Sequence, residues 1–341
     1  MVPFPHRRFD PLEARVEVAD RAFDGVPLFD AAPADAEAVS GALGSLGGAA
    51  AIGVAGLPPA WNGPGGAEFL SARRGGRHRA LVAVCDGTPL GVRAGLTLLN
   101  AEHFDAPFGP PVLQVPTQAG AFLMEAAASG AEGRVVCRAR RTGVEALNVE
   151  ARLAGADPTL APLVVMTPRS GWWQCASERG GGLACWLELM RALSAGRPRR
   201  EVRFVATTGH ELGHLGLKHF LRENSGLVKG ARAWIHLGAN FAASARPAVR
   251  FQASDAELGS LGVAALRDAG AAPDVEVPVG SRPLGEASDI FDGGGRYVSL
   301  LGANGLFHHP DDRWPDAVDL EKTARIATGL CSLARHLADA S

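Results

Sequence analysis

The chain has 341 residues, of which 47% are hydrophobic and 21% are charged, and its formal net charge is -2. This composition is typical of a globular domain protein, and the length allows two domains or one large one. The balanced charge gives no electrostatic reason to expect a nucleic acid or an anionic membrane as partner. No stretch approaches the ~18 apolar residues of a membrane span. The composition does not indicate an oligomeric state.

The N-terminal residues and the cysteines indicate the compartment. Residues 1–8 lead into no apolar segment, so we expect no signal peptide. The five cysteines are odd in number and share no metal-like spacing, so we interpret each as a buried thiol. They are Cys85, Cys137, Cys175, Cys185 and Cys331. Both features predict a cytoplasmic protein.

The first part of the chain alternates short apolar runs with Gly- and Pro-rich loops. The predicted elements are strands over 49–54, 80–84, 110–116 and 135–140, with a helix over about 119–128. We therefore expect a small β-rich domain over 21–145. Residues 1–20 are predicted to form a separate segment that packs on the second domain.

From about residue 146 the pattern changes to strands that alternate with longer helices. The predicted strands cover 148–153, 162–166, 202–206, 232–237 and 298–301, and the predicted helices cover 182–193, 215–221, 256–269 and 320–338. This alternation predicts an α/β domain over 146–341, with a mostly parallel twisted sheet flanked by helices.

The run His210-Glu211-Leu212-Gly213-His214 spells the H-E-x-x-H of zinc proteases, in which two histidines one helical turn apart bind zinc. Its setting predicts something else. Residues 201–206 are typical of a buried strand, and 207–209 of a corner between a strand and a helix. We therefore place His210 and Glu211 at the carboxyl end of a strand, where α/β sheets hold ligands. His214, one turn further on, is predicted on the helix surface or in a supporting position.

The same segment is also the middle one of three motifs that occur in order along the chain. Residues 175–182 stand where a Gly-Ala-x-Asp-Asn-x-x-Gly motif would, 210–213 match Glu-Glu-Leu-Gly, and 307–312 match Tyr-His-Thr-x-x-Asp. In this order the second half resembles the zinc exopeptidases of metallopeptidase family twenty-eight, which include leucyl aminopeptidases, glutamate carboxypeptidases and glutaminyl cyclases. The resemblance implies a zinc-exopeptidase (phosphorylase/hydrolase-like) fold. The first half is similar to the protease-associated domain that many members carry.

The resemblance also implies roles for individual residues. Glu178, Glu211 and His308 fall on the ligands of one zinc, which leaves a fourth position for water. His210 falls on the general base. Pro168 and Gly238 stand where the private ligands of the other zinc would be, so the resemblance implies one zinc ion or none.

Two neighbouring arginines leave an alternative open. Arg169 and Arg179 stand where the family has neutral or acidic residues. They have the geometry to bind a substrate carboxylate or phosphate. Equally, they could pair with the remaining carboxylates in place of a cation, which implies a metal-free protein. Glu178 also has a structural interpretation, as a carboxylate favoured by the helix dipole.

Other residues belong to the substrate side of the predicted site. In the family the strand that corresponds to 162–166 ends in a His-x-Asp pair, and the resemblance places Ser170 on that aspartate. Asp289 matches the aspartate of a late Ser-Asp loop. His236 and His309 are alternative ligands near the sheet edge. Trp172 is interpreted as the wall of a substrate pocket or as loop packing.

The resulting hypothesis is an aminopeptidase-like amide hydrolase that uses at most one zinc and acts on a peptide or small amide. Two alternatives remain: intramolecular amide transfer of the glutaminyl-cyclase type, and an inactive member that binds a peptide or metabolite. The sequence does not name the substrate.

Overall fold

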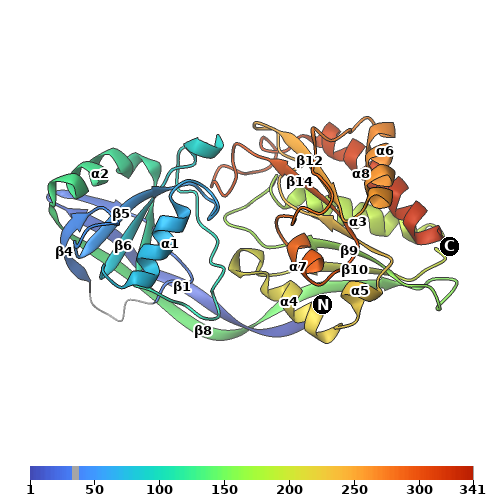
Figure 1. Cartoon of the computed structure of the whole chain (residues 1–341), viewed down its shortest axis with the longest axis horizontal. Coiled ribbons are helices and arrows are strands. Elements are labelled where there is room, and N and C mark those ends of the chain that lie inside the picture. The colour runs from blue at the N-terminus through green and yellow to red at the C-terminus, as the bar shows by residue number, and fades with distance from the viewer. Residues whose placement is uncertain (33–37, 341) are drawn as a thin grey trace.

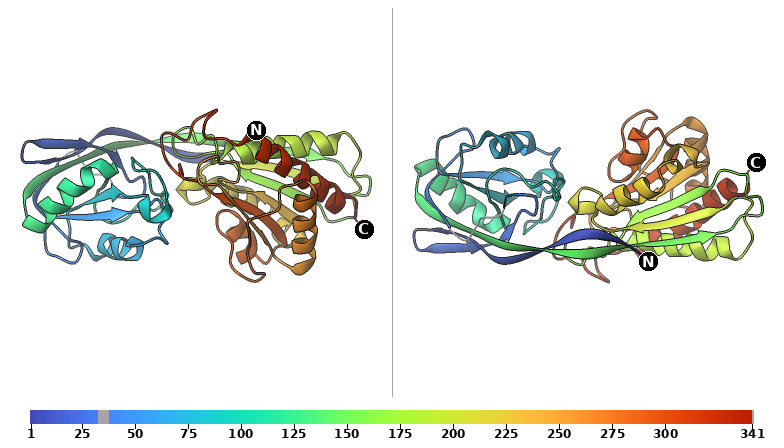
Figure 2. Two further views of the ribbon diagram at one scale, coloured as in Figure 1. Left: turned by 90° about the horizontal axis from the view of Figure 1, so that it is seen from above. Right: turned by 90° about the horizontal axis from the view of Figure 1, so that it is seen from below.

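The computed structural model describes residues 1–32 and 38–340. It has two lobes that are joined by a long two-stranded ribbon (Figure 1). The ribbon consists of β1 (Val2–Val18) and β8 (Glu132–Leu153), which pair antiparallel along their length. Figure 2 shows this ribbon running along one side of both lobes.

The ribbon corrects part of the strand prediction. The strands expected over 135–140 and 148–153 are one continuous strand, β8, and its partner β1 was not expected at all. Both strands run through both lobes, so neither strand marks where one lobe ends and the other begins. The domain boundaries expected at residues 20 and 145 therefore stay a prediction.

The smaller lobe is a layered α/β unit. Its remaining elements are β2 (Arg21–Asp24), β3 (Val26–Pro27), β4 (Val39–Gly44), β5 (Ile52–Leu57), α1 (Gly66–Gly75), β6 (Ala80–Cys85), η1 (Thr88–Leu90), β7 (Val112–Val115), η2 (Thr117–Ala119) and α2 (Gly120–Ser129). Alternate residues of β6 face opposite sides, so Val82 packs in the core that holds Leu123 of α2, while Leu81 packs in the core that holds Phe69 of α1. The likeness of this lobe to a protease-associated domain stays a prediction.

The larger lobe contains a mixed sheet in the order β13-β12-β14-β11-β9-β10-β8. Its strands are β9 (Leu163–Pro168), β10 (Val202–Thr207), β11 (Ala233–Leu237), β12 (Ala248–Ala253), β13 (Val275–Glu276) and β14 (Tyr297–Ala303). The four central strands β10, β9, β11 and β14 are parallel, whereas β8 and β12 run antiparallel to them. The predicted α/β class with a mostly parallel sheet is therefore confirmed.

Helices cover both faces of this sheet. They are α3 (Gly180–Ser194), η3 (His210–Leu212), α4 (Leu215–Glu223), α5 (Leu227–Gly230), α6 (Ala256–Asp268), α7 (Ala287–Asp292) and α8 (Leu320–Asp339). On one face α3, α6 and α8 contribute to a shared core, and α4, α5 and α7 contribute to the core on the other. Strands buried on both faces are expected to be apolar throughout, which is why they were recognisable in the sequence.

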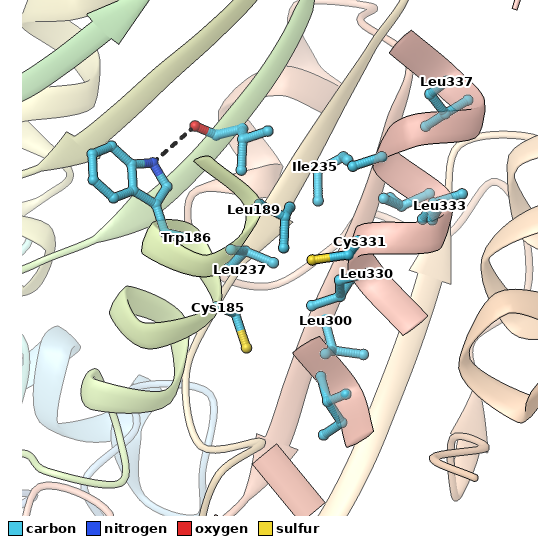
Figure 3. Packing of buried hydrophobic residues seen from close by; sticks show 14 of the residues in the cluster. Cys185, Trp186, Leu189, Ile235, Leu237, Leu300, Leu330, Cys331, Leu333 and Leu337 are labelled. Carbon is cyan, nitrogen blue, oxygen red and sulfur yellow. Dashed lines mark hydrogen bonds between the residues drawn. The ribbon is translucent and has the colours of Figure 1, made fainter. Parts of the chain in front are cut away.

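The core under α3 and α8 fixes the strands that carry the site (Figure 3). Leu189 and Leu337 are fully buried, and each such side chain contributes ~1.5–3 kcal/mol by leaving water. Trp186 donates a hydrogen bond from its indole nitrogen to the carbonyl oxygen of Val165 in β9, at 3.3 Å. This packing ties α3 to the middle of the sheet.

The structure can also be compared with the expectations about the cysteines and about membrane spans. All five cysteines are free thiols, and four are buried while Cys175 is half-buried. Among the residues that the structure describes, no helix combines the length and the apolar character that crossing a membrane requires.

Candidate functional site

The candidate site lies where three adjacent parallel strands end. β9 ends at Pro168, β10 at Thr207 and β11 at Leu237. The carboxyl edge of a parallel sheet is the usual ligand-binding edge of an α/β protein. Two groups of buried and half-buried polar side chains meet at this edge. We call them the Arg179 cluster (Ser170, Glu178, Arg179, Glu211 and His308) and the Glu286 cluster (Thr207, His210, His214, His236, Glu286 and Asp289).

In the Arg179 cluster, one guanidinium lies between two buried carboxylates. Nη2 of Arg179 lies 2.6 Å from Oε1 of Glu211 and 2.9 Å from Oε1 of Glu178. The contact with Glu211 is a hydrogen bond, whereas that with Glu178 is an ion pair without hydrogen-bond alignment. Nε of Arg179 donates to the carbonyl oxygen of Ser170 at 2.8 Å. Of the two arginines considered from the sequence, Arg179 makes the pairing with the carboxylates.

Burial makes this pairing electrostatically strong. The side chains of Arg179 and Glu178 are 3% and 0% exposed. Burial alone would raise the pKa of Glu178, but the charges of Arg179 and His308 outweigh it and lower that pKa below its usual range. Burial alone would lower the pKa of Arg179, but Glu178 and Glu211 raise it. The cluster therefore holds Glu178 ionised beside a permanent cation.

The start of α3 places Glu178 and Arg179 against the strand ends. A Cβ atom at Gly182 would lie 2.6 Å from Oγ1 of Thr167, so only glycine allows the helix to approach β9 this closely. Asp312 then fixes the turn before the helix, because its carboxylate accepts hydrogen bonds from the backbone nitrogens of Ser177 and Glu178 at 2.8 and 3.0 Å. Asp312 was matched in a motif but given no role from the sequence.

His308 reaches the same cluster from the loop after β14. Its Nδ1 lies 2.7 Å from the carbonyl oxygen of Leu98, and its Nε2 lies 3.4 Å from Oε1 of Glu178. Nε2 of His308 and both carboxylate oxygens of Glu178 are buried and have no hydrogen-bond partner. The structure thus brings His308 and Glu178 together, while Glu211 contacts the same guanidinium nitrogen as Glu178 does.

His210 and Glu211 follow the end of β10, as the sequence predicts, and they begin a short 3₁₀ helix, η3, that was not predicted. Gly209 and Gly213 flank η3 with φ angles of 80° and 87°, values that glycine adopts without strain. The rings of His210 and His214 stack with centroids 4.7 Å apart, but their Nδ1 atoms face different acids, Glu286 and Asp289. The two histidines therefore do not form the ligand pair of a helical zinc protease.

The Glu286 cluster contains the main residue that sequence reasoning missed. Glu286, just before α7, is fully buried, and Oγ1 of Thr207 lies 2.8 Å from both of its carboxylate oxygens. Burial raises the pKa of Glu286 despite the nearby charge of His214. Its position three residues before Asp289, which was matched to the Ser-Asp loop, is the signal that could have identified it.

The histidines of this cluster have pKa values shifted in opposite directions. Burial lowers the pKa of His210 well below its usual value and lowers that of His236 to about 4. Burial acts the same way on His214, but the hydrogen bond to Asp289 and the charge of Glu286 outweigh it and raise that pKa. Nδ1 of His236 lies 2.8 Å from the hydroxyl of Ser299, and its buried Nε2 has no hydrogen-bond partner.

A segment of the smaller lobe, residues 91–106, covers the Arg179 cluster; we call it the strap. Besides the contact of Leu98 with His308, the backbone nitrogen of Ala101 donates to the carbonyl oxygen of Glu211 at 2.7 Å. Gly213 makes this approach possible, because a Cβ there would lie 2.5 Å from the carbonyl oxygen of Glu102. The candidate site is therefore closed by backbone from the other lobe.

The remaining predicted residues lie around the two clusters. Arg169 is exposed and donates to the carbonyl oxygen of Leu147 and to Thr208, at 2.7 and 2.8 Å. Trp172 packs edge-on against Phe29 of the smaller lobe. His309 has both ring nitrogens on backbone groups, those of Ala94 and Asp311. The structure therefore holds these residues in packing or backbone contacts.

Comparison with known proteins agrees with this architecture. A family model described as peptidase family M28 matches residues 165–277, which run from β9 to β13 and include Glu178, Arg179 and Glu211. No curated protein matches the sequence.

Solved structures match over nearly the whole chain. An aminopeptidase from Aneurinibacillus sp. strain AM-1 is 16% identical, with a TM-score of 0.72 over 99% of this chain and 83% of that one. BSAP, a zinc aminopeptidase from Bacillus subtilis, is 14% identical, with a TM-score of 0.74 over 99% and 85%. A peptidase M28 precursor from Shewanella amazonensis SB2B is 16% identical, with a TM-score of 0.73 over 100% and 84%.

These likenesses define an aminopeptidase-like α/β fold. They cover both the larger and the smaller lobe, together with the ribbon. At identities this low the structures support the fold, while the family model adds the sequence match. The chain is thus similar in sequence to peptidase family M28 over residues 165–277 and similar in fold to zinc aminopeptidase structures over nearly its whole length.

The family and its neighbours suggest zinc, but the donor set of this chain does not fit a zinc ion. Within residues 1–32 and 38–340, no group of three or more His, Cys, Asp or Glu side chains is arranged to hold a metal. Glu178 and Glu211 both face Nη2 of Arg179, a donor that cannot bind a cation. At ~4 Å and an effective dielectric of ~20, each added positive charge would be repelled by ~4 kcal/mol.

Proposed function

We propose that this chain is an M28-family protein that binds a small peptide or amide without hydrolysing it. The observation that carries the proposal is the guanidinium of Arg179, which lies between the two carboxylates that would have to hold a metal. Metal-dependent hydrolysis needs an ion that lowers the pKa of bound water and polarises the carbonyl. A guanidinium with a raised pKa does neither.

The other groups at the strand ends do not replace that chemistry. Oε2 of Glu211 accepts a hydrogen bond from Ser170 at 3.0 Å and Oε1 accepts one from Arg179, so both oxygens are occupied. Nδ1 of His210 faces Glu286 at 3.3 Å. The arrangement supports a fixed, closed site rather than one that cycles protons through an exposed base.

A cavity beside this closed site supports peptide binding. It has a volume of about 220 Å³ and lies between the strap and α4. Glu102 and Asp105 line it from the strap, and Lys218 and Arg222 line it from α4. Opposite charges on opposite walls complement a ligand that carries both an ammonium and a carboxylate, as a short unblocked peptide does.

The test is binding measured together with turnover. Chelator-treated protein is titrated calorimetrically with dipeptides and with their N-acetylated forms, and the mixtures are analysed for hydrolysis products. We expect unblocked dipeptides to bind and remain intact, and the Lys218→Ala variant to bind them at least ~10-fold more weakly, as loss of a charged contact implies. The exposed Lys229, which does not line the cavity, supplies a matched Lys229→Ala control. Turnover by the protein, with or without added zinc, would contradict the proposal.

A second candidate is the single-zinc hydrolase. It is favoured by the oxygens of Glu178 and the Nε2 of His308, which accept no hydrogen bond and are the donors such an ion would use. It requires Glu211 to leave Arg179. Elemental analysis that finds one zinc per chain, with hydrolysis of leucyl amides, would support it. Cyclisation of N-terminal glutamine peptides under the same conditions would instead indicate the glutaminyl-cyclase type.

A further inference from the structure

We propose that the side chain of Arg179 stands in for a metal ion, so that removing it creates a divalent-metal site from Glu178, Glu211 and His308. This inference rests on the proposed function, because it assumes that the unmodified chain holds no metal at this place. It adds that the ligand positions are still prepared, and that one residue blocks them.

The position of the guanidinium supports the idea that it takes the place of a metal ion. A single nitrogen, Nη2, contacts one oxygen from each carboxylate, at 2.6 and 2.9 Å. A bound cation would likewise bridge one oxygen from each. The difference lies in bond length, because zinc holds carboxylate oxygens at about 2.0–2.2 Å. A small closure of the two acids would therefore suffice once the guanidinium is gone.

The spacing of the third donor fits a metal better than it fits a hydrogen bond. Nε2 of His308 lies 3.4 Å from Oε1 of Glu178 and has no hydrogen-bond partner. Two ligands of a tetrahedral zinc ion, each about 2.0–2.1 Å from it, lie about 3.3 Å apart. His308 and Glu178 thus have the separation of two ligands of one ion.

The donors are held by contacts that do not involve Arg179. The backbone of Glu178 is anchored by Asp312, and Oε2 of Glu211 accepts a hydrogen bond from Ser170. Nδ1 of His308 lies 2.7 Å from the carbonyl oxygen of Leu98, the kind of outer contact that orients a metal-binding histidine with its other nitrogen free. Removing the guanidinium therefore leaves Glu211 and His308 held through their side chains and Glu178 held through its backbone.

Charge determines which cations would bind. Without Arg179, two carboxylates and one histidine nitrogen remain in a site that is nearly free of water contact. A divalent ion neutralises both acids, and one nitrogen with carboxylate oxygens suits Zn²⁺ and its usual spectroscopic substitute Co²⁺. In the unmodified chain the guanidinium already supplies the positive charge.

The experiment compares chelator-treated unmodified protein with Arg179→Ala and Arg179→Gln. Each protein is titrated with Zn²⁺ by calorimetry and with Co²⁺ by visible absorption, which reports the ligand geometry directly. We expect both variants to bind one ion per chain and the unmodified protein to bind none at this site. At a zinc concentration 100-fold above Kd, the Tm of each variant should rise by about 4 °C or more.

Three controls make the result specific. Adding Glu211→Gln to Arg179→Ala should weaken zinc binding at least ~10-fold, and adding His308→Ala should do the same. Arg169→Ala removes an exposed arginine from the same sheet edge and should create no metal site. If the variants fold poorly, refolding with and without zinc replaces the titration, and recovery only with zinc supports the inference.

The outcomes separate this inference from the proposed function. Folded Arg179→Ala and Arg179→Gln proteins that bind no zinc would overturn the inference alone, as would refolding yields that zinc does not change. Tight stoichiometric zinc binding by the unmodified protein at Glu178, Glu211 and His308 would overturn both.

Discussion

The two polar clusters at the strand ends keep buried acids in different ways. In the Arg179 cluster the acids Glu178 and Glu211 face a guanidinium, and burial is offset by a permanent cation. In the Glu286 cluster the acid faces a threonine hydroxyl and histidines, and burial raises its pKa. The same edge of one sheet therefore carries one cluster with fixed charge and one whose charge depends on pH.

This difference follows from the chemistry of the cations. Arginine stays protonated at every pH at which a protein is folded, whereas histidine changes charge near neutrality. The first cluster is expected to be indifferent to pH but intolerant of losing its cation. The second is expected to tolerate substitution better but to shift with pH. Four predictions test this contrast.

The largest expected effect is the loss of stability in metal-free Arg179→Ala. Removing one partner of a buried ion pair leaves two carboxylates without compensation, which costs about 3–5 kcal/mol. The free energy of unfolding from urea titration measures it. Arg169→Ala, at an exposed position with neutral partners, should change that free energy by less than ~1 kcal/mol. Equal effects of the two substitutions would remove the distinction between a buried cation and a surface one.

The second prediction concerns His236 and acid pH. Burial lowers its pKa to about 4, so the folded state binds fewer protons than the unfolded state between pH 6.5 and 4. The contribution of His236 to the free energy of unfolding, on the order of 3 kcal/mol, is therefore complete above pH 6.5 and is lost as the pH falls towards 4. His236→Gln should flatten the pH dependence of the unfolding free energy across this range, while His103→Gln, at an exposed position, should not. Unchanged slopes in both variants would contradict a buried neutral His236.

The strands that carry these clusters could be predicted because they are buried on both faces. Largely apolar runs mark β9, β10 and β11, and the polar residues just after them mark the site. The ribbon was missed because its middle has no such signal. Residues 142–145 of β8 are all exposed, so the sequence there lacks the alternation of apolar and polar residues that indicates a strand.

The site itself could be predicted only as a set of residues, not as an arrangement. The sequence identifies Glu178, Glu211 and His308 as candidates for one site. It also allows the hypothesis that an arginine pairs with the two acids. It does not distinguish Arg169 from Arg179, because that depends on the turn before α3. The strap contacts the site through backbone atoms of Leu98 and Ala101, and such contacts leave no pattern in side chains.

The third prediction concerns Ser170, which connects the two clusters. Its hydroxyl donates to Glu211 and accepts from the backbone nitrogens of Gly209 and His210, at 3.0, 2.9 and 3.1 Å. Ser170→Ala leaves these groups without a partner and should lower the free energy of unfolding by about 1–3 kcal/mol. Ser194→Ala, at an exposed helix position, should lower it by less than ~0.5 kcal/mol. If Ser170→Ala is equally mild, the two clusters are held independently.

The smallest expected effect lies in the pair formed by His214 and Asp289, 2.6 Å apart. Burial would lower the pKa of His214, but Asp289 and Glu286 raise it. A raised histidine pKa contributes stability that is complete below the unfolded value of about 6.5 and is lost as the pH rises through the folded value. This slope is opposite to that of His236, so the two histidines can be separated within one pH series. Asp289→Asn should lower the pKa of His214 in an NMR titration and cost about 1 kcal/mol or less at pH 6. A His214 pKa that does not move would show that Glu286 alone sets the charge of the second cluster.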